Sequence, residues 1–109
     1  MIHISKIIAL IDKQLKKLQP KEVVQFKTYK KDRGFIIYCF SSTEFQIVEV
    51  GFENASFVGD LAETRKQAKR CLDREFPRSN KVWVEYFQNV PSPYEVKGFN
   101  AEQMNLLIP

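Results

Sequence analysis

The hexapeptide Phe35-Ile36-Ile37-Tyr38-Cys39-Phe40 decides the fold. Six consecutive apolar residues, most of them β-branched or aromatic, are typical of a strand. Because successive side chains of a strand point to opposite faces, this strand is apolar on both faces and needs cover at least partly on each side. We therefore expect residues 35–40 to form a central strand of a sheet.

Stretches with the same strand character lie on both sides of this hexapeptide. Residues 22–29 and 45–52 are rich in β-branched and aromatic residues, and a short strand at 56–58 follows the second of them. The connection 30–34 is polar and ends in glycine, which predicts a hairpin between the first two strands. Residues 81–88 are expected to form the last strand. Together these segments predict an antiparallel sheet of about four to five strands.

Two segments have the 3.6-residue period of amphipathic helices. Over residues 4–18 the apolar residues recur on one arc, lysines occupy the opposite arc, and Pro20 ends the pattern. The second helix is expected to begin at Asp60, which has Glu63 three residues later as in a capping box, and to end before Pro77. Both helices can cover the same face of the sheet.

The expected fold class is therefore α+β, with two helices packed on one face of the antiparallel sheet and the order α-β-β-β(-β)-α-β. A chain of 109 residues has the size of one domain, so residues 1–109 are expected to form a single small domain. Residues 89–109 are expected to form an extension that packs on this domain. A short helical turn is predicted at its end, because Asn100 and Gln103 have the spacing of a capping pattern.

The sequence predicts a cytoplasmic protein that does not enter a membrane. Its longest apolar runs are about half a dozen residues, whereas a membrane-spanning helix needs roughly 18 to 20. The first residues lack the pattern of a cleavable signal peptide. Cys39 and Cys71 lie in stretches predicted to be core, so we expect free buried thiols, as suits a reducing compartment.

Residue types that bind metals or act as nucleophiles do not cluster in this sequence. It has one His and two Cys, without the spacing of a zinc site, and its four glycines are isolated rather than gathered in a phosphate-binding loop. We therefore expect no metal, no cofactor and no catalytic residue, which favours a protein that is not an enzyme. Acid–base chemistry by Glu44, Glu49 and Glu85 on the predicted strands is the open alternative.

Positive charge is unevenly distributed along the chain. The net charge is +4 and the pI is about 9.1, yet residues 35–59 contain no Lys or Arg. On the second helix, basic residues project along one flank beside the apolar face, near free backbone N–H groups that favour phosphate. The alternative is that these charges only solvate the surface. The candidate nucleic-acid-binding residues lie on this flank and at the hairpin tip: Arg65, Lys66, Lys69, Arg70, Lys30, Lys31 and Arg33.

The segment Thr64-Arg65-Lys66-Gln67-Ala68-Lys69-Arg70 resembles the second-helix signature of double-stranded RNA-binding domains. In that signature two basic residues, two spacers and a third basic residue grip phosphates. The resemblance extends loosely to the order of helix, antiparallel strands and helix, whereas a strand after the final helix is not part of that family's pattern. The resemblance implies that this flank contacts the phosphates of an RNA duplex.

Aromatic residues are in surplus, at 13% of the chain. If both helices cover one face of the sheet, several rings lie on the other face, where they could stack unpaired bases or form a protein interface. Alternatively, the chain after Gln88 folds back and buries them. The candidate platform or interface residues are Tyr29, Tyr38, Phe40, Trp83 and Phe87.

These features lead to two hypotheses of different classes. The first is a small intracellular, non-enzymatic module that binds RNA or DNA through the helix flank and the hairpin tip. The second is a regulatory or assembly protein that forms a homodimer, or docks another protein, through the aromatic sheet face. The salt dependence of binding distinguishes the two hypotheses. Phosphate contacts release counterions, so nucleic-acid binding should weaken steeply with added salt, whereas binding through an apolar interface should change little.

Overall fold

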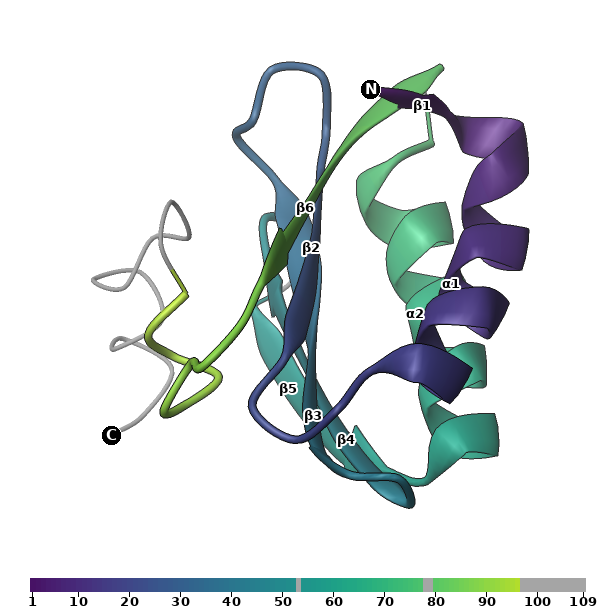
Figure 1. The fold of residues 1–109 in the computed structure, drawn as a ribbon. Helices are drawn as coiled ribbons and strands as arrows, with labels where there is room; N and C mark the ends of the chain where they lie inside the picture. The colour runs from purple at the N-terminus through teal and green to yellow at the C-terminus, as the bar shows by residue number, and fades with distance from the viewer. Residues whose placement is uncertain (53, 78–79, 97–109) are drawn as a thin grey trace.

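The computed structural model describes residues 1–52, 54–77 and 80–96. Two α-helices pack on one face of a six-stranded sheet (Figure 1). In chain order the elements are β1 (Ile2–His3), the 3-10 helix η1 (Ile4–Lys6), α1 (Ile7–Lys17), β2 (Val23–Lys27), β3 (Gly34–Ser41), β4 (Glu44–Val50), β5 (Ala55–Gly59), α2 (Leu61–Glu75) and β6 (Lys81–Phe87).

The sheet has the strand order β1-β6-β2-β3-β4-β5, and every neighbouring pair is antiparallel. Strand β3 contains the hexapeptide and lies between β2 and β4, as predicted. The α+β class and the two helices on one face are confirmed. The strand count is higher than predicted, because the two residues of β1 add to the outer side of β6, with Ile2 opposite Val82.

Strand β6 follows α2 in the chain but pairs with β2, which comes early (Figure 1). In this register Val84 lies opposite Phe26, and Trp83 lies opposite Lys27. Paired residues of antiparallel strands point to the same face, so Val84 faces the helices with Phe26, whereas Trp83 faces the other side with Lys27. This pairing brings the start of β6 beside the hairpin between β2 and β3.

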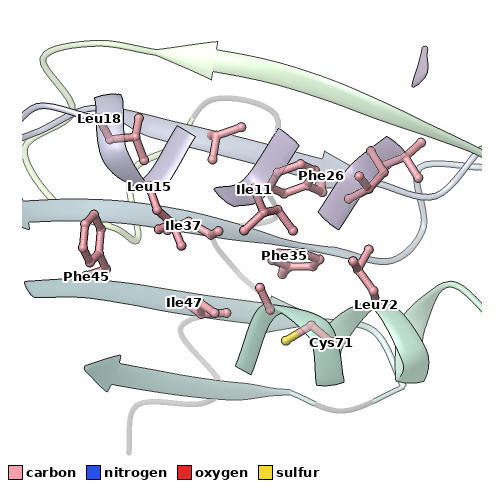
Figure 2. Packing of buried hydrophobic residues seen from close by; sticks show 14 of the residues in the cluster. Ile11, Leu15, Leu18, Phe26, Phe35, Ile37, Phe45, Ile47, Cys71 and Leu72 are labelled. Carbon is pink, nitrogen blue, oxygen red and sulfur yellow. The ribbon is translucent and has the colours of Figure 1, made fainter. Parts of the chain in front are cut away.

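The main core lies between the helices and the sheet (Figure 2). The rings of Phe26 and Phe35 stack with centroids 4.9 Å apart, and Phe76 meets Phe35 edge-on at 6.0 Å. Both thiols are free and buried. The side chains at the centre of this core are Ile7, Ile11, Leu15, Leu18, Val24, Phe26, Phe35, Ile37, Cys39, Phe45, Ile47, Ala68, Cys71, Leu72, Phe76 and Val82.

Helix α2 begins as its sequence predicts. The Asp60 carboxylate accepts a hydrogen bond from the Glu63 backbone N–H at 2.9 Å, and the Glu63 carboxylate accepts one from the Asp60 N–H at 3.1 Å. This is a complete capping box. Helix α1 is shorter than the predicted 4–18, because residues 4–6 form the 3-10 turn η1 before it.

A second, smaller core covers the opposite face of the sheet. There, Val90 and Val96 pack against Val23, Ile36, Tyr38, Val48 and Val50. The Tyr38 hydroxyl donates a hydrogen bond of 2.6 Å to the Val90 carbonyl oxygen. The chain that follows β6 therefore returns over this face at least as far as Val96, and the helical turn predicted near Asn100 lies outside the described residues.

Candidate functional site

The hairpin between β2 and β3 lies at one end of the sheet, beside the start of β6 (Figure 1). The Trp83 indole N–H of β6 donates a hydrogen bond of 3.0 Å to the Tyr29 carbonyl oxygen. The Lys31 ammonium lies 4.6 Å from the centroid of the Trp83 ring, a cation–π contact. Two predicted aromatic residues and a predicted basic residue are thus in one place, although they come from distant parts of the chain.

Backbone and side-chain bonds fix the shape of the hairpin tip. The Lys31 N–H donates to the Thr28 carbonyl at 2.9 Å, and the Thr28 hydroxyl donates to an Asp32 carboxylate oxygen at 2.9 Å. Lys31 has a positive φ of 61°, a left-handed conformation that only a turn of this kind accommodates at low cost. The tip therefore holds Tyr29 and Lys30 outward, where both are exposed.

A cleft of about 570 Å³ opens between the hairpin tip and the start of β6. This volume lies within the range of about 300–1,000 Å³ that is typical of small-ligand sites. The Tyr29 side chain is 63% exposed. Besides this ring, the lining has three cationic side chains, one carboxylate, one amide and one hydroxyl group. The lining residues are Thr28, Tyr29, Lys30, Asp32, Arg33, Asn80 and Lys81.

Arg33 anchors the hairpin rather than extending into solvent. Its Nε lies 3.4 Å from a Glu75 carboxylate oxygen, and its Nη2 donates a hydrogen bond of 2.6 Å to the Glu75 backbone oxygen. The Glu75 side chain is fully buried at the end of α2 and also accepts a hydrogen bond from the Phe52 N–H at 2.8 Å. Of the three basic residues predicted at the tip, Lys30 and Lys31 are exposed and Arg33 is used to hold the structure.

A second buried carboxylate lies next to this one. Glu49 of β4 is 1% exposed and accepts hydrogen bonds from Arg74 Nε at 2.9 Å and Arg74 Nη2 at 2.6 Å. Although burial opposes ionisation, the hydrogen bonds that Glu49 makes with Arg74, with the neighbouring Glu75 side chain and with Cys71 hold the pKa of Glu49 below its usual value. Burial raises the pKa of the Cys71 thiol, which donates to Glu49 at 3.4 Å. Glu49 is thus a structural carboxylate, and it does not share an open face with the exposed Glu44 and Glu85.

The basic flank of α2 is exposed, as its sequence pattern implies. Arg65 forms an ion pair with Asp12 of α1, with 2.5 Å between Arg65 Nε and Asp12 Oδ1. This pair neutralises part of the flank and ties the helices together. The remaining cations on the outer surface of the two helices are Lys13, Lys16 and Lys17 of α1 and Lys66, Lys69 and Arg70 of α2.

The aromatic residues predicted to form a platform do not form one continuous surface. Tyr38 is 2% exposed, because the chain around Val90 covers it. Phe87 is half-buried beside the same cluster, and Phe40 is 40% exposed with its ring 4.9 Å from that of Tyr38. Only Tyr29 and Trp83 lie at the hairpin end, so the candidate site there has one open ring and one half-buried ring.

Two residues of this end were missed by sequence reasoning, Asn80 and Lys81, which line the cleft. Lys27 lies next to them as the cross-strand neighbour of Trp83. The pKa of Lys27 is lowered mainly by burial, while the charge of Glu85 raises it and that of Lys31 lowers it. Only the pairing of β6 with β2 reveals these neighbours, and no local sequence pattern carries that information.

Within the described ranges, no group of His, Cys, Asp and Glu side chains is arranged to hold a metal ion. Among the helices of those same ranges, none has the length and apolar character needed to cross a bilayer. Comparison of the chain with protein-family models, with curated proteins and with solved structures finds no match. The chemistry of the hairpin-end cleft and of the basic helix surface is therefore what points to a function.

Proposed function

We propose that this protein is a non-enzymatic module that binds single-stranded nucleic acid at the hairpin-end cleft. The observation that carries the proposal is the exposed Tyr29 ring beside Lys30 and Lys81 in one cleft of about 570 Å³. Proteins that bind single strands combine aromatic rings, on which bases stack, with cations that follow the backbone. Stacking of one base on one ring contributes about 1–3 kcal/mol.

Residues in and beside the cleft have supporting roles in this proposal. Trp83 holds the Tyr29 backbone through its indole N–H, and Lys31 covers the Trp83 ring. Trp83 is thus a positioning residue, and the free ring is that of Tyr29. Asn80, which is exposed, offers an amide to the edge of a base.

Asp32 is the one described acidic residue in the lining, and it accepts a hydrogen bond from Thr28. Arg33 of the lining is compensated by Glu75, whereas Lys30 and Lys81 outnumber Asp32, so the cleft keeps an excess of positive charge that favours an anionic ligand.

The outer surface of the helices supplies a second set of phosphate contacts. Lys66, Lys69 and Arg70 of α2 are exposed, as are the lysines Lys13, Lys16 and Lys17 of α1. Contacts of this type do not depend on base sequence and weaken steeply with salt. Since both cysteines are free, the proposed setting is a reducing compartment, the cytoplasm.

Docking of a protein through the aromatic sheet face has less support as a function. That proposal needs Tyr38 and Phe87 to be accessible, whereas Tyr38 is buried under Val90 and Phe87 is half-buried.

The experiment is a fluorescence-anisotropy titration of the whole chain with labelled single-stranded and duplex RNA and DNA of one length, at two salt concentrations. We expect single strands to bind more tightly than duplexes, and Tyr29→Ala to raise the Kd for a single strand about five- to 150-fold, the equivalent of one stacked base. Lys81→Glu should raise it as well. Lys21→Glu is the matched charge control, because Lys21 is exposed and precedes β2 at the strand end away from the hairpin tip.

Duplex preference together with a loss of binding only in Lys66→Glu would assign recognition to the helix surface and overturn the proposed cleft. Absence of binding to all four nucleic acids at low salt would overturn the proposed function as a whole.

A further inference from the structure

Strand β5 is the outer strand at one side of the sheet, and among the described residues it pairs only with β4. Its sequence, Ala55-Ser56-Phe57-Val58-Gly59, contains no charge and no proline. Proteins usually protect such an edge with lysine, proline or a bulge, because its unpaired backbone groups attract another strand. Val58 is 51% exposed, and Phe52 just before β5 is 73% exposed.

Helix α2 lies beside this edge, over β4 and β5 (Figure 1). Its buried residues Thr64, Ala68 and Cys71 face the sheet, and Arg65 reaches across to Asp12 of α1. With about 100° between successive residues, the flank opposite Arg65 is formed by Glu63, Gln67 and Arg74, with Arg70 adjoining.

Two contacts place this flank on the β5 side. A Cβ added to Gly59 of β5 would lie 2.9 Å from the Glu63 Cβ. At the other end of the helix, Arg74 holds Glu49, which is the cross-strand neighbour of Ala55.

The charges of this flank change sign along the helix. Glu63 lies in the first turn, whereas Arg70 lies in the second half, close to Arg74, whose charge is already paired with Glu49. Two copies of such a flank in antiparallel orientation place the acidic end of each beside the basic end of the other. The flank is therefore complementary to itself, as a two-fold interface requires.

We propose that β5 and the Glu63–Arg74 flank of α2 form the interface of a homodimer in which two β5 strands pair antiparallel. A two-fold axis at Phe57 pairs all five residues of the strand. It sets Phe57 opposite Phe57, Ser56 opposite Val58, and Ala55 opposite Gly59 of the second copy. The two sheets then become one continuous sheet, with all four α-helices on the same face.

An axis at Phe57 also suits the distribution of charge along α2. Phe57 precedes Gly59 by two strand residues, about 6.6 Å, which equals the rise of about four helical residues. Since Glu63 lies beside Gly59, the helix residue beside Phe57 is Gln67. An axis at that level brings Glu63 opposite the stretch of the second α2 between Arg70 and Arg74.

The absence of Lys and Arg over residues 35–59 lets two copies of a chain with net charge +4 approach at this edge.

The test is sedimentation equilibrium of the whole chain, without nucleic acid, from 1 to 200 µM. We expect a mass of twice 12.8 kDa at the upper end. The double variant Ser56→Lys with Val58→Lys sets lysine against lysine at two places in the pair and should raise the dimer Kd at least tenfold. The matched control, Ser42→Lys with Thr43→Lys, adds the same charge in the exposed β3–β4 turn and should dimerise as the wild type does.

Glu63→Gln tests the helix part of the interface. Gln retains the capping box, so the fold is kept while the charge is lost. The Kd should rise severalfold and depend less on salt.

Cross-linking tests the register and does not depend on the lysine variants folding. An equimolar, oxidised mixture of Ser56→Cys and Val58→Cys proteins should form a covalent dimer, because these positions face each other across the two-fold. Each variant alone should cross-link much less. In a dimer of one variant, the two introduced cysteines are diagonal neighbours across the strand pair and not directly opposite each other. A monomer at 200 µM, a Ser56→Lys with Val58→Lys protein that still dimerises, or equal cross-linking in the unmixed variants would each overturn the proposal. None of these outcomes depends on nucleic-acid binding.

Discussion

Arg74 donates two hydrogen bonds to Glu49, from Nε at 2.9 Å and from Nη2 at 2.6 Å, and this pairing ties the second half of α2 to β4. Glu49 is almost wholly buried, so its charge depends on this guanidinium for compensation. The neighbouring pair of Arg33 and Glu75 ties the hairpin to the end of the same helix. Two arginines and two buried glutamates thus connect the core with the end of the sheet that carries the cleft.

Removal of one partner from the buried pair is expected to be costly. Arg74→Ala leaves the Glu49 carboxylate without its main partner, and we expect a loss of about 3 kcal/mol in the free energy of unfolding, measured by urea denaturation. Arg70→Ala is the matched control on the same helix, because Arg70 is exposed, and its effect should stay within about 0.5 kcal/mol. Equal stabilities of the two variants would show that the pair contributes little.

The stability of the fold should depend on pH through Glu49. Its pKa is lowered in the folded protein from the ordinary value of 4.5, so the unfolded chain takes up this proton first as the pH falls. The stabilisation by Glu49 is thus complete above the unfolded pKa and is lost as the pH falls through the lower folded pKa. Glu49→Gln should therefore flatten the decline of unfolding free energy below about pH 5. Glu44→Gln, at the exposed start of the same strand, should keep the wild-type slope, and equal slopes for both variants would contradict this role.

Tyr38 should hold the chain after β6 on the second face of the sheet. Tyr38→Phe removes the 2.6 Å hydrogen bond to the Val90 carbonyl, and we expect a cost of about 1 kcal/mol, with faster amide exchange around Val90. Tyr86→Phe removes a hydroxyl from a side chain that is 50% exposed and serves as the control. Exchange rates near Val90 that do not differ between the two variants would argue against this contact as the anchor.

The parts of the fold that follow from local patterns could be predicted from the sequence. The strand at Phe35–Phe40 and the helix that begins at Asp60 are examples. The first is predicted by a run of apolar residues and the second by a capping box, and both patterns involve residues that are close together in the sequence. Pairings between distant residues could not be predicted. The Arg33–Glu75 pair and the contact of Trp83 with Tyr29 arise only when β6 pairs with β2 and α2 crosses the sheet.

The same limit applies to the candidate site. The composition of the 30–34 connection predicts a basic tip, and Lys30 and Lys31 are indeed exposed. The burial of Tyr38 by Val90, by contrast, depends on where the chain goes after β6. An exposed ring and a buried ring have the same sequence signature in a strand, so the sequence does not distinguish the aromatic residues that a ligand can reach from those that the chain covers.

Trp83 should act as the positioning residue of the hairpin cleft. Trp83→Phe keeps a ring beneath Lys31 but removes the 3.0 Å hydrogen bond to the Tyr29 carbonyl. We expect a modest loss of stability, about 1 kcal/mol, and weaker binding of a single-stranded oligonucleotide in an anisotropy titration. Binding by Trp83→Phe that equals that of the wild type would remove Trp83 from the positioning role.

The central claim is that Tyr29 and the lysines around it bind single-stranded nucleic acid. Trp83 is the only tryptophan of the chain and its indole is hydrogen-bonded to the Tyr29 backbone, so its fluorescence reports, without a label, on the hairpin end beside the cleft. The most direct measurement is a titration of Trp83 fluorescence with an unlabelled single-stranded oligonucleotide, for the wild type and for Tyr29→Ala. We predict saturable quenching in the wild type and a Kd at least fivefold higher in Tyr29→Ala, whereas no quenching, or the same Kd in both proteins, would contradict the claim.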